Sequence, residues 1–171
     1  MPRFSLMILL LGLLPGFLAH AGEMQVYRFR DSSASPTGSN ISRPATFSSP
    51  FPFDRMYAEF TAEQKALVRD QYKNMTDQEE PPWPKNGLRP LYQEANRNLY
   101  SVKGRIEAAP IMAVAHVDEK GEVKEVRMFK TPDADTTTAV SAALFRTQFK
   151  PALNNGKPVA MDFLLDFTLD R

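Results

Sequence analysis

Few residues of this chain have side chains suited to acid–base or metal chemistry, and the clearest group lies near its end. Asp162, Asp166 and Asp170 are four residues apart, a spacing that places all three on one face of a strand. A row of carboxylates can bind a cation or transfer protons. Far more often, such a row keeps a strand soluble and discourages indiscriminate pairing with other chains.

The other chemically capable groups are isolated from one another. His116 is the only histidine after residue 21, and the chain contains no cysteine. A zinc site or a serine–histidine triad needs more than a single imidazole. Residues 132–135, Pro-Asp-Ala-Asp, hold two carboxylates without the ligand spacing of a calcium loop, so we expect them to cap the next helix. The sequence therefore predicts a protein that is not an enzyme and that holds neither a metal nor a cofactor.

The composition gives no support for nucleic-acid binding. The 171 residues carry a formal charge of +1, and no run of lysine or arginine interrupts them. Proteins that bind nucleic acid concentrate positive charge on one face or along one segment. A chain of this length typically forms one compact domain with some flanking sequence.

Residues 1–21 have the three-part layout of a secretory signal peptide. Arg3 supplies the positive charge, an apolar run covers residues 4–19, and small residues stand where a cleavage site requires them. The alternative is a permanent membrane anchor, but this run gives roughly 24 Å of helix against about 30 Å of hydrocarbon. We expect a cleaved, exported protein that begins at Gly22 and makes no further membrane contact.

Residues 22–58 are rich in serine and proline, a composition that predicts a flexible segment rather than part of a core. Phe47, Phe51 and Phe53 complicate this interpretation. Either they dock onto the folded part of the chain, or they are scattered apolar residues of a mobile tail. The sequence leaves both alternatives open.

Residues 59–79 are expected to form a helical extension. The sequence Thr-Ala-Glu-Gln from Thr61 has the form of a capping box, and the apolar spacing after it predicts a helix to about residue 75. A second short helix is predicted over residues 90–99, because Pro90 suits the first helical position.

The remainder of the chain follows the order strand, strand, helix, strand. Alternating apolar residues predict a hairpin of strands 111–117 and 122–129, with Gly121 at the strained position of its turn. The spacing then changes to that of a helix, which Pro132 or Asp135 can begin. This order predicts an α+β fold, in which a small antiparallel sheet is covered on one face by a helix and is preceded by the extra helices.

A long last strand is predicted over residues 159–169, after a turn at Asn155 and Gly156. Every second residue is apolar and is expected to face the helix: Val159, Met161, Phe163, Leu165, Phe167 and Leu169. At about 3.3 Å per residue the strand extends roughly 36 Å, so part of its backbone should remain unpaired and accept a further strand. The outward side chains of this predicted partner-binding edge are Asp162, Leu164, Asp166 and Thr168.

Several of these features occur together in one known family. A proline–aromatic–proline step precedes the short helix, and the later helix leads into an aromatic-x-Pro-Ala step and an Asn-Gly-Lys-Pro-Val turn. The residues that carry the pattern are Pro81, Trp83, Pro84, Phe149, Pro151, Gly156 and Pro158. From residue 80 to 171 the chain resembles the TonB C-terminal domain, the periplasmic end of the energy transducer for outer-membrane receptors. Thr147 departs from the pattern, because many members have a tryptophan there.

The resemblance implies a periplasmic domain that acts by protein contact. In the family, partner peptides add as a strand to an exposed sheet edge. The expected partners are therefore envelope proteins, such as a peptide of a TonB-dependent receptor or a periplasmic scaffold, with a role in outer-membrane transport. Two alternatives remain: an envelope-assembly module that binds the cell wall with the same fold, and a membrane-anchored energy transducer if the N-terminus is not cleaved.

Overall fold

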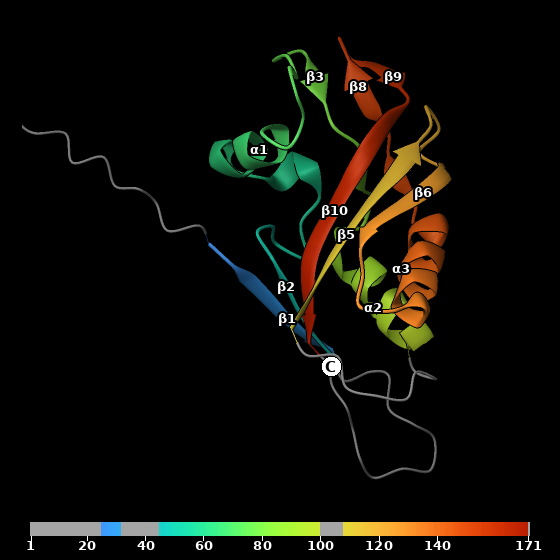
Figure 1. Ribbon diagram of the computed structural model, residues 1–171. Coiled ribbons are helices and arrows are strands. Elements are labelled where there is room, and N and C mark those ends of the chain that lie inside the picture. The colour runs from blue at the N-terminus through green and yellow to red at the C-terminus, as the bar shows by residue number, and fades with distance from the viewer. Residues whose placement is uncertain (1–24, 32–44, 100–107, 171) are drawn as a thin grey trace, which may run out of the picture.

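The computed structural model describes residues 25–31, 45–99 and 108–170, which form an α+β arrangement of helices and antiparallel strands (Figure 1). In chain order the elements are β1 (Tyr27–Asp31), β2 (Ala45–Ser49), the 3-10 turn η1 (Tyr57–Glu59), α1 (Ala62–Arg69), β3 (Glu79–Glu80), β4 (Trp83–Pro84), α2 (Arg89–Asn98), β5 (Ala109–Val117), β6 (Val123–Lys130), α3 (Ala134–Arg146), β7 (Phe149–Lys150), β8 (Ala152–Asn154), β9 (Lys157–Val159) and β10 (Met161–Asp170). The fold class predicted from the sequence is confirmed.

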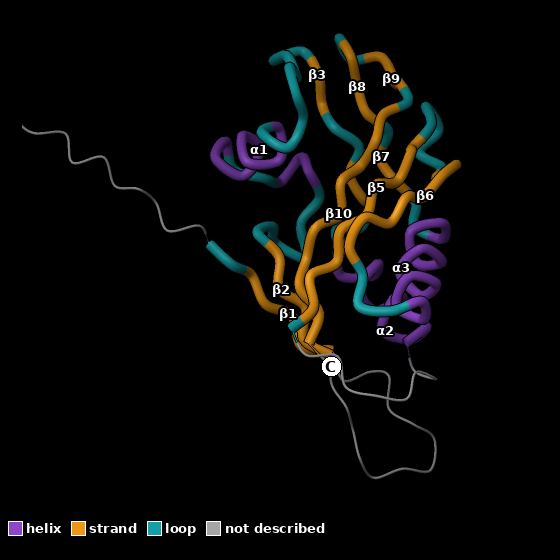
Figure 2. Tube along the Cα trace, in the orientation of Figure 1, coloured by secondary structure: helices purple, strands orange, loops and turns teal. Residues whose placement is uncertain are grey.

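The main sheet has five antiparallel strands in the order β1-β2-β10-β5-β6, and α2 and α3 lie on one of its faces (Figures 1 and 2). β10 pairs with β5 from Met161, opposite Val117, to Leu169, opposite Ala109. On its other side β10 pairs with β2 at residues 168–170. β10 is therefore not an outermost strand of the sheet, but β2 covers only its last residues, so part of its backbone has no neighbouring strand on this side within the described chain.

The predicted hairpin and the helix that follows it are formed by local interactions. The N–H of Gly121 donates to the Asp118 carbonyl across the turn between β5 and β6, and Gly121 has a φ of +83°. The Asp133 carboxylate accepts from the N–H of Thr136 at 2.6 Å and caps α3. The predicted capping role of residues 132–135 is confirmed, and α3 begins at Ala134.

The capping box of α1 is also confirmed, but α1 ends at Arg69 rather than near residue 75. Thr61 accepts from the N–H of Gln64, and the Gln64 side chain accepts from the N–H of Thr61. The Arg69 guanidinium donates to the carbonyl of Thr76 and to the Asp77 carboxylate, which folds the following segment back onto the helix. α2, at Arg89–Asn98, lies close to its predicted range.

The N-terminal segment is part of the folded domain where it is described. Residues 22–58 were expected to be flexible, but residues 27–31 and 45–49 form β1 and β2. Phe47 is fully buried, and Phe51 and Phe53 are 5% exposed. The docking alternative is therefore correct, because burying these rings removes a large apolar area from water.

Two groups of aromatic rings fill the space between the main sheet and the elements packed against it. In the first, Phe163 of β10 lies 5.7 Å from Trp83 and 5.0 Å from Phe149, measured between ring centroids. In the second, Phe167 lies 4.7 Å from Tyr92 and 5.8 Å from Phe47. The alternation of β10 therefore places its apolar side chains in the core from Phe163 onward, as predicted.

The expected continuous strand over residues 159–169 is divided at Ala160. β9 forms a hairpin with β8 in the small sheet β3-β8-β9, and β10 begins at Met161 in the main sheet. Asn155 and Gly156 have φ values of +51° and +75°, which correspond to the two-residue turn predicted there. The residues predicted as one strand therefore belong to two different sheets.

Replacing Gly156 by valine should lower the free energy of unfolding by roughly 1–3 kcal/mol. A β-branched side chain is strained at a φ of +75°, although no atom lies within 4 Å of the position where its Cβ would be. Chemical denaturation of both proteins measures the difference. An unchanged midpoint would mean that the turn does not need positive φ at this residue.

Candidate functional site

The feature most suited to binding is the side of β10 that faces away from β5. β5 pairs with β10 along nearly its whole length, whereas β2 reaches only residues 168–170. The chain leaves this side of β10 after Ser49, before Pro50, which has no N–H to donate. In the part of the chain that the structure describes, residues 161–167 thus have a strand on one side only. We refer to this stretch as the open edge.

Tyr72, from the turn after α1, lies against the middle of the open edge. Burial raises the pKa of Tyr72, and the neighbouring backbone of Leu164 opposes part of this rise. Only a donor stabilises a phenolate, so the group involved is the N–H of Leu164. The open edge is therefore partly covered by a single hydroxyl rather than by a strand.

The orientation of the Leu164 N–H also fixes which other backbone groups lie along the open edge. In a strand, alternate residues direct their N–H and C=O to the same side. Asp162 and Asp166 therefore direct theirs toward the open edge, together with Leu164. These three residues are members of the partner-binding set predicted from the sequence, and the structure brings their backbone groups into one row.

Thr168, the fourth member of that set, does not belong to the open edge. It lies opposite Ser48 of β2, so its backbone already has a neighbouring strand on this side. A further strand therefore cannot pair with Thr168 on this side, because β2 from the N-terminal segment already occupies the position.

The side chain of Asp162 belongs to a cluster on the sheet face opposite the helices. Its carboxylate accepts from Arg127 of β6 at 2.7 Å and lies 2.8 Å from Nδ1 of His116. His116 stands directly opposite Asp162 in the β5–β10 pairing. All three side chains are about half exposed, so the cluster lies at the surface.

The three aspartates of β10 do not gather around a common point where a cation could bind. Asp162 is paired with Arg127, Asp166 is exposed, and Asp170 lies opposite Thr46 of β2. Among residues 25–31, 45–99 and 108–170, no group of three or more histidine or acidic side chains could hold a metal ion. The row therefore separates into individual surface residues.

The residues that carry the family resemblance have structural roles. Trp83 is 2% exposed, and its Nε1–H donates to the carbonyl of Arg55 at 3.3 Å. Pro84 pairs with Phe149 between β4 and β7, and Pro151 follows β7 directly. The remaining three, Pro81, Gly156 and Pro158, lie in the connection before β4, in the turn between β8 and β9, and in β9.

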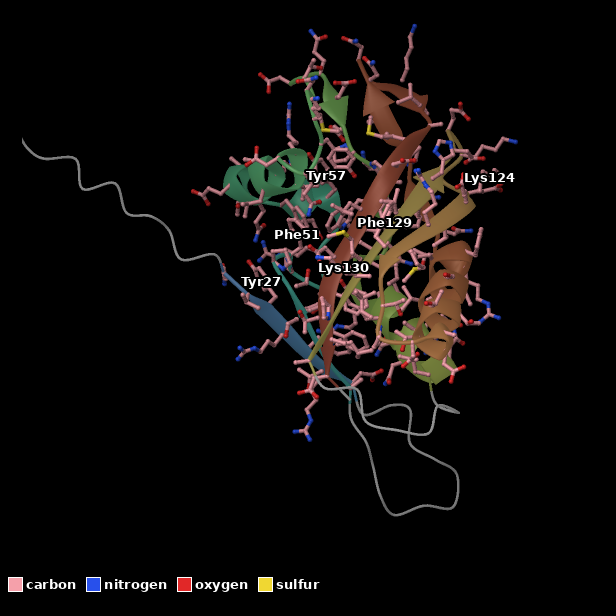
Figure 3. All side chains as sticks on the ribbon, in the orientation of Figure 1. Tyr27, Phe51, Tyr57, Lys124, Phe129 and Lys130 are labelled. Atoms are coloured by element: carbon pink, nitrogen blue, oxygen red, sulfur yellow. The ribbon has the colours of Figure 1, made fainter. Side chains whose placement is uncertain are left out.

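Side chains from the α1 region complete the surroundings of the open edge. Tyr57 and Phe51 lie on the side of β10 where α1 is found (Figure 3). The Tyr57 ring has Lys150 at 5.3 Å and Lys65 at 5.6 Å from its centroid. Neither Tyr57 nor Tyr72 was predicted to belong to a binding site, because Tyr57 lies in the segment expected to be flexible and Tyr72 lies in the predicted helical extension.

Comparisons with known proteins add no assignment. No family model matches the chain, and no curated protein matches it. Within the described ranges, none of the helices has the length and apolar character needed to cross a membrane. The predicted signal peptide, residues 1–21, lies outside the described residues.

Proposed function

We propose that this chain is a periplasmic, TonB-like protein that binds an extended peptide of an envelope protein by strand addition, as part of outer-membrane transport. The observation that carries the proposal is the open edge, where residues 161–167 of β10 have β5 on one side and no strand on the other within the described chain. An extended peptide placed there pairs with residues 161–167 of β10, on the same side of β10 as β2. Main-chain hydrogen bonds then supply the affinity.

The side chains along the open edge set the preference for the peptide. Asp162 and Asp166 point to the outer face of the sheet on either side of Leu164, and Asp166 is exposed. Opposite charges on neighbouring strands attract, whereas like charges repel. We therefore expect a peptide with an apolar residue near Leu164 and a basic residue near Asp166.

Tyr72 competes with such a peptide for the N–H of Leu164. An incoming strand must displace the hydroxyl from its place beside the Leu164 backbone while the ring stays packed against the core. Removing the hydroxyl in Tyr72→Phe should therefore strengthen peptide binding.

The test uses a synthetic peptide copied from the N-terminal segment of a TonB-dependent receptor, with binding followed by amide NMR shifts and titration calorimetry. We expect the largest shifts at Asp162, Leu164 and Asp166. Leu164→Pro should weaken binding about tenfold or more, because proline lacks the N–H and also blocks close approach. Leu164→Ala, which keeps the N–H, is the matched control and should bind within a few-fold of the natural chain.

Thermal unfolding must first establish that Leu164→Pro remains folded. The proposal fails if the folded proline variant binds the peptide as tightly as the alanine variant does. It also fails if the amide shifts map to β6 or β1, the two outer strands of the main sheet.

A further inference from the structure

A pocket of about 330 Å³ lies between α2, α3 and the turn that follows β4. Pro90, Leu91, Glu94 and Arg97 line it from one face of α2, and Ala143 and Arg146 line it from α3. The helices lie on one face of the main sheet, so the pocket is separate from the open edge of β10 (Figure 1). The function proposed above does not use these residues.

The charged groups of the pocket are arranged around one carboxylate. Glu94 accepts from Arg97 through Oε2 and from Arg146 through Oε1, the latter at 2.6 Å. Both guanidinium groups lower the pKa of Glu94, so its carboxylate is ionised near neutral pH. The two arginines come from different helices, which fixes their separation through helix packing rather than through a flexible loop.

Two cations around one anion leave an excess of one positive charge in the pocket. A guanidinium has five N–H donors, and the pairing with Glu94 uses only some of them. The Arg97 and Arg146 side chains are 56% and 65% exposed, whereas that of Glu94 is 22% exposed. The accessible surface of the cluster is therefore cationic, and its carboxylate lies beneath.

The accessible wall of the pocket includes a smaller amount of apolar surface. Pro90 is exposed and Thr147 is half-buried, and both line the pocket, whereas Leu91 and Ala143 lie beneath them in the hydrophobic core. Ligand pockets typically combine an apolar lining with a few polar groups that orient the ligand. Here the polar groups are guanidinium donors, and the volume lies at the small end of the usual range of about 300–1,000 Å³.

We propose that this pocket binds a ligand that carries one carboxylate on an aliphatic body the size of one or two amino-acid residues. The carboxylate accepts from Arg97 and Arg146, and the aliphatic part packs on Pro90 and on the methyl group of Thr147. Planar guanidinium groups match carboxylate geometry well, and these two already hold one carboxylate, that of Glu94. The same chemistry occurs in the C-terminal residue of a peptide and in a free organic acid.

Titration calorimetry with three probes tests the proposal on the full mature chain. The probes are the dipeptide N-acetyl-Ala-Leu as the free acid, the same dipeptide as its C-terminal amide, and N-acetyl-leucine. We expect the dipeptide acid to bind at least about tenfold more tightly than the amide, because charge-assisted hydrogen bonds are lost with the carboxylate. Equal affinity for the two acids indicates a free organic acid, whereas tighter binding of the dipeptide acid indicates a peptide C-terminus.

Two variants locate the binding. Arg146→Gln removes one cation and should weaken binding of the dipeptide acid about tenfold. Thr147→Trp places a large side chain in the pocket wall and should abolish binding, since Thr147 lines the same pocket. Arg127→Gln is the matched control, because Arg127 also pairs with a carboxylate but lies on β6, and it should bind as the natural chain does.

Melting curves show whether each variant is folded, and Arg146 is exposed enough for its replacement to leave the fold intact. The proposal is overturned if neither acid binds saturably, or if the amide binds as tightly as the acid. It is equally overturned if folded Arg146→Gln and Thr147→Trp both retain the natural affinity. None of these results depends on whether a peptide binds at the open edge of β10.

Discussion

Replacing Phe47 by alanine should lower the free energy of unfolding by about 3–5 kcal/mol, the range expected when a buried phenylalanine is truncated. Phe47 is fully buried in β2, and its ring stacks on Tyr92 at 5.0 Å and lies 5.8 Å from Phe167. The ring thus connects the N-terminal segment to α2 and to β10. Urea denaturation followed by circular dichroism measures the loss.

Phe129→Ala is the matched control, because it removes the same ring from a position that is 60% exposed on β6 (Figure 3). Its effect should stay within about 0.5 kcal/mol, as is usual for surface substitutions. Equal stabilities of the two variants would contradict the packing of Phe47. The β1–β2 hairpin would then contribute little to the stability of the domain.

The elements that are predicted well from the sequence are those that depend only on residues close together in the chain. The hairpin of β5 and β6 depends on alternation and on one glycine turn, and both are properties of consecutive residues. The caps of α1 and α3 depend on Thr61 and Asp133, each of which bonds a residue three positions ahead. The turn at Asn155 and Gly156 likewise needs nothing beyond its own backbone.

The serine- and proline-rich composition of residues 22–58 does not predict β1 and β2, whereas the alternation of side chains over residues 45–49 does indicate a strand. Residues 45–49 alternate between buried and half-buried, with Ala45, Phe47 and Ser49 on the inner face. Pro44 and Pro50 bound the strand, as prolines commonly do. A serine- and proline-rich stretch can therefore contain a short core strand, provided that its apolar residues recur with a period of two.

The candidate site was predicted in part, and the missing part concerns long-range pairing. Alternation correctly places Asp162, Leu164 and Asp166 on the outer face of β10. Whether a strand lies beside them depends on β2, which is more than a hundred residues away in sequence. No local pattern contains that information, so the unavailability of Thr168 and the position of Tyr72 became visible only in the structure.

Replacing Gly121 by alanine should lower the free energy of unfolding by about 2–5 kcal/mol, the sum of two separate costs. The residue has a φ of +83°, which an alanine adopts only with strain. In addition, a Cβ at this position would lie 2.0 Å from the carbonyl oxygen of Phe149, whose N–H donates to the Gly121 carbonyl. Because both groups belong to the backbone, β7 or the hairpin must move. Denaturant unfolding at equilibrium measures the total.

Gly156→Ala separates the two costs, because Gly156 has a similar φ of +75° but no atom within 4 Å of its would-be Cβ. Only the backbone strain remains, so the loss should be about 1–2 kcal/mol. The excess at Gly121 then measures the close approach between the hairpin turn and Phe149, a contact that holds the β5–β6 turn against the segment leading into β10. If the two alanine variants lose equal stability, that contact is looser than 2.0 Å implies, and the hairpin turn is free to adjust.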